Sequence, residues 1–185
     1  MKCLRFLAIP TAIAATVMAL NANADDAEVI ANLKNSKISL LEDIGQAEKT
    51  SGPALSAKFE MDDDNKLSLS VYTAPQGLNT PAESNDLTEL SGNPTEIPFA
   101  PKAEIFKDKE HIARASAHLT IMQLSKFTLS EIIQKAVAAQ PGMPYSVADP
   151  QIRDGEPVVD VFIADANGKS AKVTVNVQTG GLTRY

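Results

Sequence analysis

The strongest constraint on the fold is an internal repeat. Segments 39–47 and 128–136 align at an offset of 89 residues, with Leu, Glu, Ile and Ala at matching positions. Each begins with the pattern S/T-x-x-E, in which the hydroxyl accepts a hydrogen bond from the backbone N–H three residues on and the Glu side chain accepts one from the cap's own N–H. Because this capping box fixes where a helix begins, the sequence predicts two helices that start at equivalent points of a duplicated unit.

Alternating apolar residues follow each predicted helix. In the second half they flank Asn167-Gly168, which is the strongest short signal for a β-hairpin. In the first half they flank an acidic turn at 62–65. Because successive side chains of a strand point to opposite faces, this pattern predicts antiparallel strands with one covered face and one wetter face. The alternating segments are 55–61, 66–73, 158–164 and 171–178.

These elements predict an α+β fold built from two units, each a helix packed on an antiparallel sheet. The stretch 75–101 is rich in Pro, Asn, Ser and Gly and is predicted to be a long loop with a short strand. Amphipathic helices are expected at 27–34 and at 106–124, the second of which docks the two halves together. The predicted divisions are a signal peptide at 1–24, the first unit at 25–90, the loop and connecting helix at 91–125, and the second unit at 126–185.

The first 24 residues have the pattern of a cleavable secretory signal peptide. Lys2 and Arg5 precede an uncharged, mostly apolar run at 6–20, and Ala22-Asn23-Ala24 forms an A-x-A cleavage site. An uncleaved membrane anchor or a buried helix is the alternative, which the run fits less well because a bilayer span needs about 20 apolar residues. The sequence therefore predicts a periplasmic or secreted protein.

Removal of this segment leaves an acidic chain without cysteine, because Cys3 is the only cysteine. The formal net charge is −6, and the loss of Lys2 and Arg5 makes it −8. Lys/Arg clusters dominate affinity for nucleic acids and anionic membranes, so neither is expected as a partner. Stable membrane insertion after signal cleavage is not expected either. The remaining 161 residues suffice to bury a core without disulfides.

The two histidines offer a weak case for a metal site. His111 and His118 lie two turns apart on one predicted helix, with Asp108 one turn from His111. A protein metal site needs more converging ligands, so partly exposed helix histidines are the favoured interpretation. The acidic turn 62–65 lacks the Gly and the closing Glu of an EF-hand loop and is predicted only to link two strands.

Other polar groups have structural explanations. Glu42 and Glu131 could pass for paired carboxylates, but their capping boxes account for both. Gly180-Gly181 is predicted to be a turn at a strand end rather than a phosphate loop, because no helix follows it. No nucleophile motif is present. No catalytic, cofactor-binding or metal-binding residue is therefore assigned, no cofactor is expected, and the chain is not expected to be an enzyme.

The repeated unit resembles the PepSY domain. In that family a capped helix is followed by two or three strands and a closing turn of the form V-x-x-x-T-G-x-L, which here is Val175–Leu182. The second unit matches this pattern throughout, and the first matches over the helix 39–47 and two strands, with 78–90 as an enlarged closing strand and turn.

The resemblance implies a non-enzymatic exported module that binds an exported or envelope protein, with a peptidase among the candidates. In this family the proposed role is the inhibition or local regulation of peptidases, and it has no established catalytic residues to carry over. The alternative, favoured only by His111, His118 and the acidic turn, is a periplasmic protein that binds a small ligand or a metal.

Overall fold

The two repeated segments form helices that begin where the capping boxes predict. In the computed structural model, which describes residues 24–184, they are α2 (Leu40–Ser51) and α4 (Leu129–Ala139). The Ser39 N–H donates to Glu42 over 2.8 Å, and the Glu42 N–H returns a bond to the Ser39 hydroxyl over 3.2 Å. Thr128 and Glu131 form the same pair of bonds at the same distances. Both predicted capping boxes are confirmed.

The structural repeat starts before the capping boxes. The Ser36 hydroxyl donates to the Ile38 carbonyl over 2.5 Å, and the Ser125 hydroxyl donates to the Phe127 carbonyl over 2.6 Å. In both units the N–H of the same hydrophobic residue returns a bond to the serine. Ile38 and Phe127 then pack against the core just ahead of their helices. The chain therefore enters α2 and α4 by the same turn.

One antiparallel sheet runs through both units. Its eight strands, among the described residues, lie in the order β4-β3-β2-β1-β5-β6-β7-β8. The order is symmetric about the β1–β5 junction, where Ala57 pairs with Val147 and Lys58 pairs with Ser146. The strands are β1 (Ala54–Met61), β2 (Leu67–Thr73), β3 (Thr88–Gly92), β4 (Lys102–Ile105), β5 (Met143–Arg153), β6 (Glu156–Ala164), β7 (Ser170–Asn176) and β8 (Leu182–Arg184). The α+β fold is confirmed, and the two sheets are continuous.

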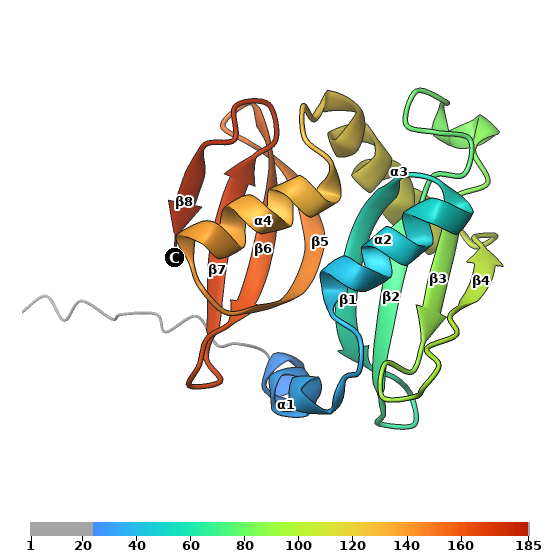
Figure 1. The fold of residues 1–185 in the computed structure, drawn as a ribbon. Helices are drawn as coiled ribbons and strands as arrows, with labels where there is room; N and C mark the ends of the chain where they lie inside the picture. The colour runs from blue at the N-terminus through green and yellow to red at the C-terminus, as the bar shows by residue number, and fades with distance from the viewer. Residues whose placement is uncertain (1–23, 185) are drawn as a thin grey trace, which may run out of the picture.

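The two faces of this sheet differ in polarity. One face carries buried apolar residues such as Leu69 and Val71, and α2 and α4 pack on it side by side (Figure 1). The other face carries a polar row of Ser70, Lys58 and Ser146, which face one another across β2, β1 and β5. Helix α3 (Lys109–Leu124) contacts β1, β5 and β6 and lies behind the sheet in Figure 1. It therefore crosses the junction between the units, as the sequence predicts.

The first unit extends further than the sequence indicates. The boundary predicted at residue 90 lies inside β3, and β4 pairs with β3 beyond it. The closing turn of this unit is 93–101 rather than 78–90, because Asn93 accepts from Thr95 N–H just as Asn176 accepts from Gln178 N–H in the second unit. Strand β4 has only four residues, all of them exposed, and its alternation of Lys, Ala, Glu and Ile is too short to mark a strand in the sequence.

Short helices complete the chain. Helix α1 (Ala24–Asn32) and the 3-10 turn η1 (Leu33–Asn35) bury Val29 and Leu33 against β1 and β7, between the two halves in Figure 1. A second 3-10 turn, η2 (Ala82–Ser84), lies between β2 and β3. Apart from Ala24, the predicted signal peptide, with Cys3, lies outside the described residues. Across residues 24–184, no helix has the length and apolar character needed to cross a membrane.

Candidate functional site

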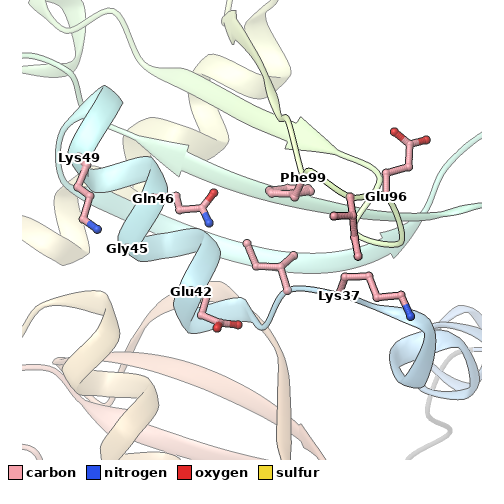
Figure 2. Close-up of a pocket in the computed structure, with 9 residues that line it drawn as sticks. Lys37, Glu42, Gly45, Gln46, Lys49, Glu96 and Phe99 are labelled. Carbon is pink, nitrogen blue, oxygen red and sulfur yellow. The ribbon is translucent and has the colours of Figure 1, made fainter.

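The first candidate site is a groove beside α2, here called the α2 groove. Its wider part has a volume of about 530 Å³ and lies between α2 and the loop 93–101. Gln46 on the helix and Phe99 on the loop point into it from opposite sides, and Lys37 and Lys49 lie at its two ends (Figure 2). The residues that line this part are Lys37, Ile38, Glu42, Gly45, Gln46, Lys49, Glu96, Ile97 and Phe99.

The groove continues along α2 over the sheet. A second hollow of about 370 Å³ shares Gln46 with the first and has Leu90 of β3 and Ala103 of β4 in its lining. Ala103 pairs with Leu90, which pairs with Val71, so all three side chains lie on the α2 face of the sheet. Helix α2 itself packs on β1, β2 and β5 and leaves β3 and β4 as the floor of the groove.

Exposed apolar side chains lie in the groove and on the edge strand next to it. Ile97, in the loop, is 79% exposed, and Ile105, at the end of β4, is 49% exposed. Strand β4 ends the sheet, so along one side its backbone groups pair with no strand among the described residues. An open strand edge next to exposed apolar side chains is a common template for pairing with another chain.

The second unit shows what closes such a groove. Its closing turn, 177–181, is shorter than the loop 93–101 and packs against α4, so that a Cβ on Gly180 would lie 3.1 Å from the Phe127 ring and 3.4 Å from Lys135 Nζ. Lys135 also lies 4.4 Å from the centroid of the Phe127 ring. In the first unit the equivalent residues, Ile38 and Gln46, line the open groove. The longer loop therefore leaves open a space that the second unit fills.

The second candidate site lies on the opposite face of the sheet, under α3, and is here called the α3 cavity. It has a volume of about 360 Å³. Lys58 enters it from β1, Arg114 from α3 and Asp149 from β5. Its lining consists of Ser56, Lys58, Ser70, Tyr72, Arg114, His118, Ser146, Ala148 and Asp149.

His118 is the most unusual group in this cavity. Its side chain is only 2% exposed, and its Nε2 has no hydrogen-bond partner among the described residues. Burial, with smaller contributions from Arg114 and Lys58, lowers the pKa of His118 to about 4, so the ring is neutral near pH 7. A buried polar atom without a partner costs about 1–3 kcal/mol, so such an atom needs an explanation.

The charged groups around the cavity influence one another. Lys58 forms an ion pair with Glu60, which also accepts from the Ser70 hydroxyl. Desolvation and the Asp160 carboxylate raise the pKa of Asp149, whereas Lys172 and Lys58 lower it. No Glu110–Arg114 ion pair occurs in the described chain although their spacing favours one. Arg114 instead acts on Tyr72, whose pKa is raised by burial and by Glu89 and lowered by Arg114.

The neighbouring Asp160 has its partners within the second unit. Its buried carboxylate accepts from Arg153 over 3.2 Å and from the Thr174 hydroxyl, and lies 3.3 Å from Lys172. A buried carboxylate needs such partners to offset its desolvation. This cluster therefore stabilises the second unit.

The two histidines do not form one site. His111 is half-buried, lies 2.7 Å from the Asp108 carboxylate and stacks on Phe106, whereas His118 is buried under α3. The interpretation as partly exposed helix histidines is confirmed for His111 and is wrong for His118, because α3 packs that face on the sheet. Within residues 24–184, no group of three or more His, Cys, Asp and Glu side chains is placed to hold a metal ion.

The other polar motifs have the structural roles that the sequence indicates. Asp62 accepts from the N–H groups of Asp64 and Lys66 and closes the turn between β1 and β2. Hydrogen bonds within the capping boxes lower the pKa of Glu42 and of Glu131. The α2 groove and the α3 cavity are not predicted from the sequence, because the residues that line each of them come from distant segments. The alternating polar residues of β1 were the available signal for the cavity.

Comparisons with known proteins give little further direction. No family model matches the chain, and no curated protein matches it. Among solved structures, the chain is similar to a putative lipoprotein from Clostridium difficile 630, with 13% sequence identity and a TM-score of 0.37. This similarity covers 81% of the present chain and 95% of the other. A likeness at that TM-score carries no argument about function.

Proposed function

We propose that the chain is an exported, non-enzymatic binding protein of the PepSY type, and that it holds an extended segment of an exported or envelope protein in the α2 groove. The observation that carries this proposal is the difference between the two units. The same helix and sheet are closed by the turn at Gly180 in the second unit and left open by the loop 93–101 in the first. Export is supported by the signal-peptide pattern of residues 1–24.

An extended segment suits this groove better than a helix does. The free edge of β4 offers backbone N–H and C=O groups to an added strand, and alternate side chains of that strand would enter the groove beside Ala103 and Ile105. Backbone pairing of this kind supplies affinity with little sequence specificity. The mixed charges at Lys37, Lys49 and Glu96 favour a segment that is itself near neutral. The regulation of a peptidase would follow if the bound segment belonged to one.

The proposal is tested with short peptides rather than with an unknown partner. A library of displayed octapeptides is selected on the chain without residues 1–24, and selected peptides are titrated by fluorescence anisotropy. Ile105→Arg places a charge on the edge strand β4, on the same face as the lining residue Ala103, and is expected to weaken binding by about tenfold or more. Leu182→Arg is the matched control, because Leu182 is 41% exposed on the opposite edge strand, β8.

A single pattern of results supports the proposal: peptides bind saturably, Ile105→Arg weakens them, and Leu182→Arg leaves their affinity unchanged. Loss of affinity in both variants, or in the β8 variant alone, contradicts the assignment to the α2 groove. The peptidase role is tested separately by casein cleavage in periplasmic extract. The chain is expected to slow this cleavage and Ile105→Arg is expected to abolish the effect. An unchanged cleavage rate removes the peptidase role.

A further inference from the structure

We infer that the α3 cavity is a second binding site, which takes a small zwitterion such as a free amino acid or a dipeptide. This inference is independent of the α2 groove, because the cavity lies on the other face of the sheet and is lined by other residues. It starts from His118, which belongs to the lining of the cavity and whose buried Nε2 lacks a partner among residues 24–184. A bound polar group within reach would satisfy that nitrogen.

Groups of both charges face the same cavity. Arg114 and Lys58 are both near enough to His118 to lower its pKa, and Lys58 also lowers the pKa of Asp149. An arginine can hold a carboxylate by two parallel hydrogen bonds, and an aspartate can accept from an ammonium group. Because the positive charge of Lys58 is partly neutralised by Glu60, the charges around the cavity are close to balanced. Such a lining fits a ligand that carries one carboxylate and one amino group.

Neutral polar groups occupy the space between the charges. Ser56 and Ser146 lie on the same face of the sheet as Lys58, on β1 and β5, and belong to the lining of the cavity. Tyr72, on β2, adds a hydroxyl to the same lining. A peptide or amino-acid backbone would use these groups as donors and acceptors. Ligand pockets usually range from about 300 to 1,000 Å³, so a volume of about 360 Å³ suits a small molecule.

The face of the sheet is unusual for a purely structural surface. Polar side chains occupy the central strands, where α3 covers them, although a covered face is ordinarily apolar. The nearby Asp160 is an example of a buried polar group with a structural role, because it pairs with Arg153 and Lys172 and accepts a hydrogen bond from Thr174. His118 lacks such partners, and this contrast favours a ligand.

The test is an NMR and calorimetric titration of the chain with L-alanine, L-serine and the dipeptide of two L-alanines. At least one probe is expected to bind saturably and to shift the His118 ring ¹⁵N signals. N-acetylation or amidation of that probe removes one of its two charges, and each is expected to weaken binding by about tenfold or more. Arg114→Ala is expected to weaken binding by a similar factor, because Arg114 is the carboxylate partner.

Arg184→Ala is the matched control, since it removes an exposed arginine from β8, on the outer edge of the sheet. It is expected to leave the affinity unchanged. Because Arg114 is also exposed, both variants are expected to keep the unfolding midpoint of the parent chain. The inference is overturned if no probe binds saturably, if both charge-blocked probes bind as well as the parent probe, or if Arg184→Ala weakens binding as much as Arg114→Ala.

Discussion

At the scale of single residues, the repeat is broken at one buried position. Asp43 in α2 aligns with Ile132 in α4, and both side chains are 0% exposed. The Asp43 carboxylate oxygens have no hydrogen-bond partner among residues 24–184, and burial raises the pKa of Asp43 to about 7. A carboxylate without partners favours its neutral form when it is buried. The first unit therefore carries a titratable group where the second carries an apolar one.

Asp43→Asn is expected to stabilise the chain at pH 8 and to have little effect at pH 4. Asp43 binds a proton in the folded chain up to about pH 7 but loses it near pH 4 when unfolded, so its contribution to stability falls as the pH rises between these values. The gain at pH 8 is on the order of 2–4 kcal/mol. Urea unfolding at both pH values measures it, with Asp63→Asn in the exposed turn as the control.

His118 gives this experiment a second readout. Its pKa is lowered from 6.5 to about 4 in the folded chain, so the unfolded chain binds the extra proton and stability is lost as the pH falls through this range. The effects of Asp43 and His118 oppose each other between about pH 4 and pH 6.5. In Asp43→Asn the opposing Asp43 effect is removed, so stability should fall more steeply on acidification than it does in the parent chain. A stability that stays flat over this range would contradict the burial of His118.

The predictive value of the sequence also differs from residue to residue. Glu42 and Glu131 are correctly assigned to capping boxes because their partners lie three residues away. The burial of Asp43 and His118 is not predictable in the same way, because it depends on what packs over one face of a helix. The lining of the α3 cavity cannot be predicted from the sequence for the same reason, since β1, β2, α3 and β5 meet there only in the folded chain.

At the scale of elements, local signals decide which parts are predictable. Helices α2 and α4 begin at their predicted caps, and strands β1, β2, β6 and β7 follow the alternating segments, whereas the longest strand, β5, lies in none of them. Strand β4 is not predicted because an alternation of four residues is too short a signal, and these residues gain their structure from pairing with β3. The α2 groove depends on the loop before that strand, and so it is also invisible in the sequence.

The caps themselves are expected to matter for stability. Ser39→Ala and Thr128→Ala each remove the hydroxyl that accepts from the Glu N–H, which costs about 1 kcal/mol. For a chain of this size that corresponds to a fall of about 2–4 °C in Tm. The two costs should add in the double variant, because the caps lie on different helices.

Ser130→Ala is the matched control for the caps. Ser130 lies within α4, where alanine is the better helix former, so this change should not lower Tm. Thermal unfolding followed by circular dichroism measures all four variants. A Tm for Thr128→Ala that equals that of Ser130→Ala would show that the second capping box adds nothing to stability.

At the scale of the whole molecule, the two units are one structure. The β1–β5 junction is short, with Ala57 opposite Val147 and Lys58 opposite Ser146. Helix α3 reinforces it by packing on β1, β5 and β6, and α1 contacts both β1 and β7. On the other face, α2 lies against α4. The sequence predicts two units and a docking helix, but it does not predict the shared sheet, because no local pattern records which two strand edges will meet.

This arrangement predicts that the chain unfolds in one step and that its halves do not fold alone. A fragment of residues 126–184 would expose the edge of β5, including the backbone next to the buried Val147, and would lose α1 and α3. The fragment is therefore expected to lack a cooperative thermal transition by circular dichroism. In the intact chain the calorimetric and van't Hoff enthalpies should agree, as they do for a two-state domain. Two resolved transitions, or a folded fragment, would mean that each unit has an independent core and that the junction is only a contact between two domains.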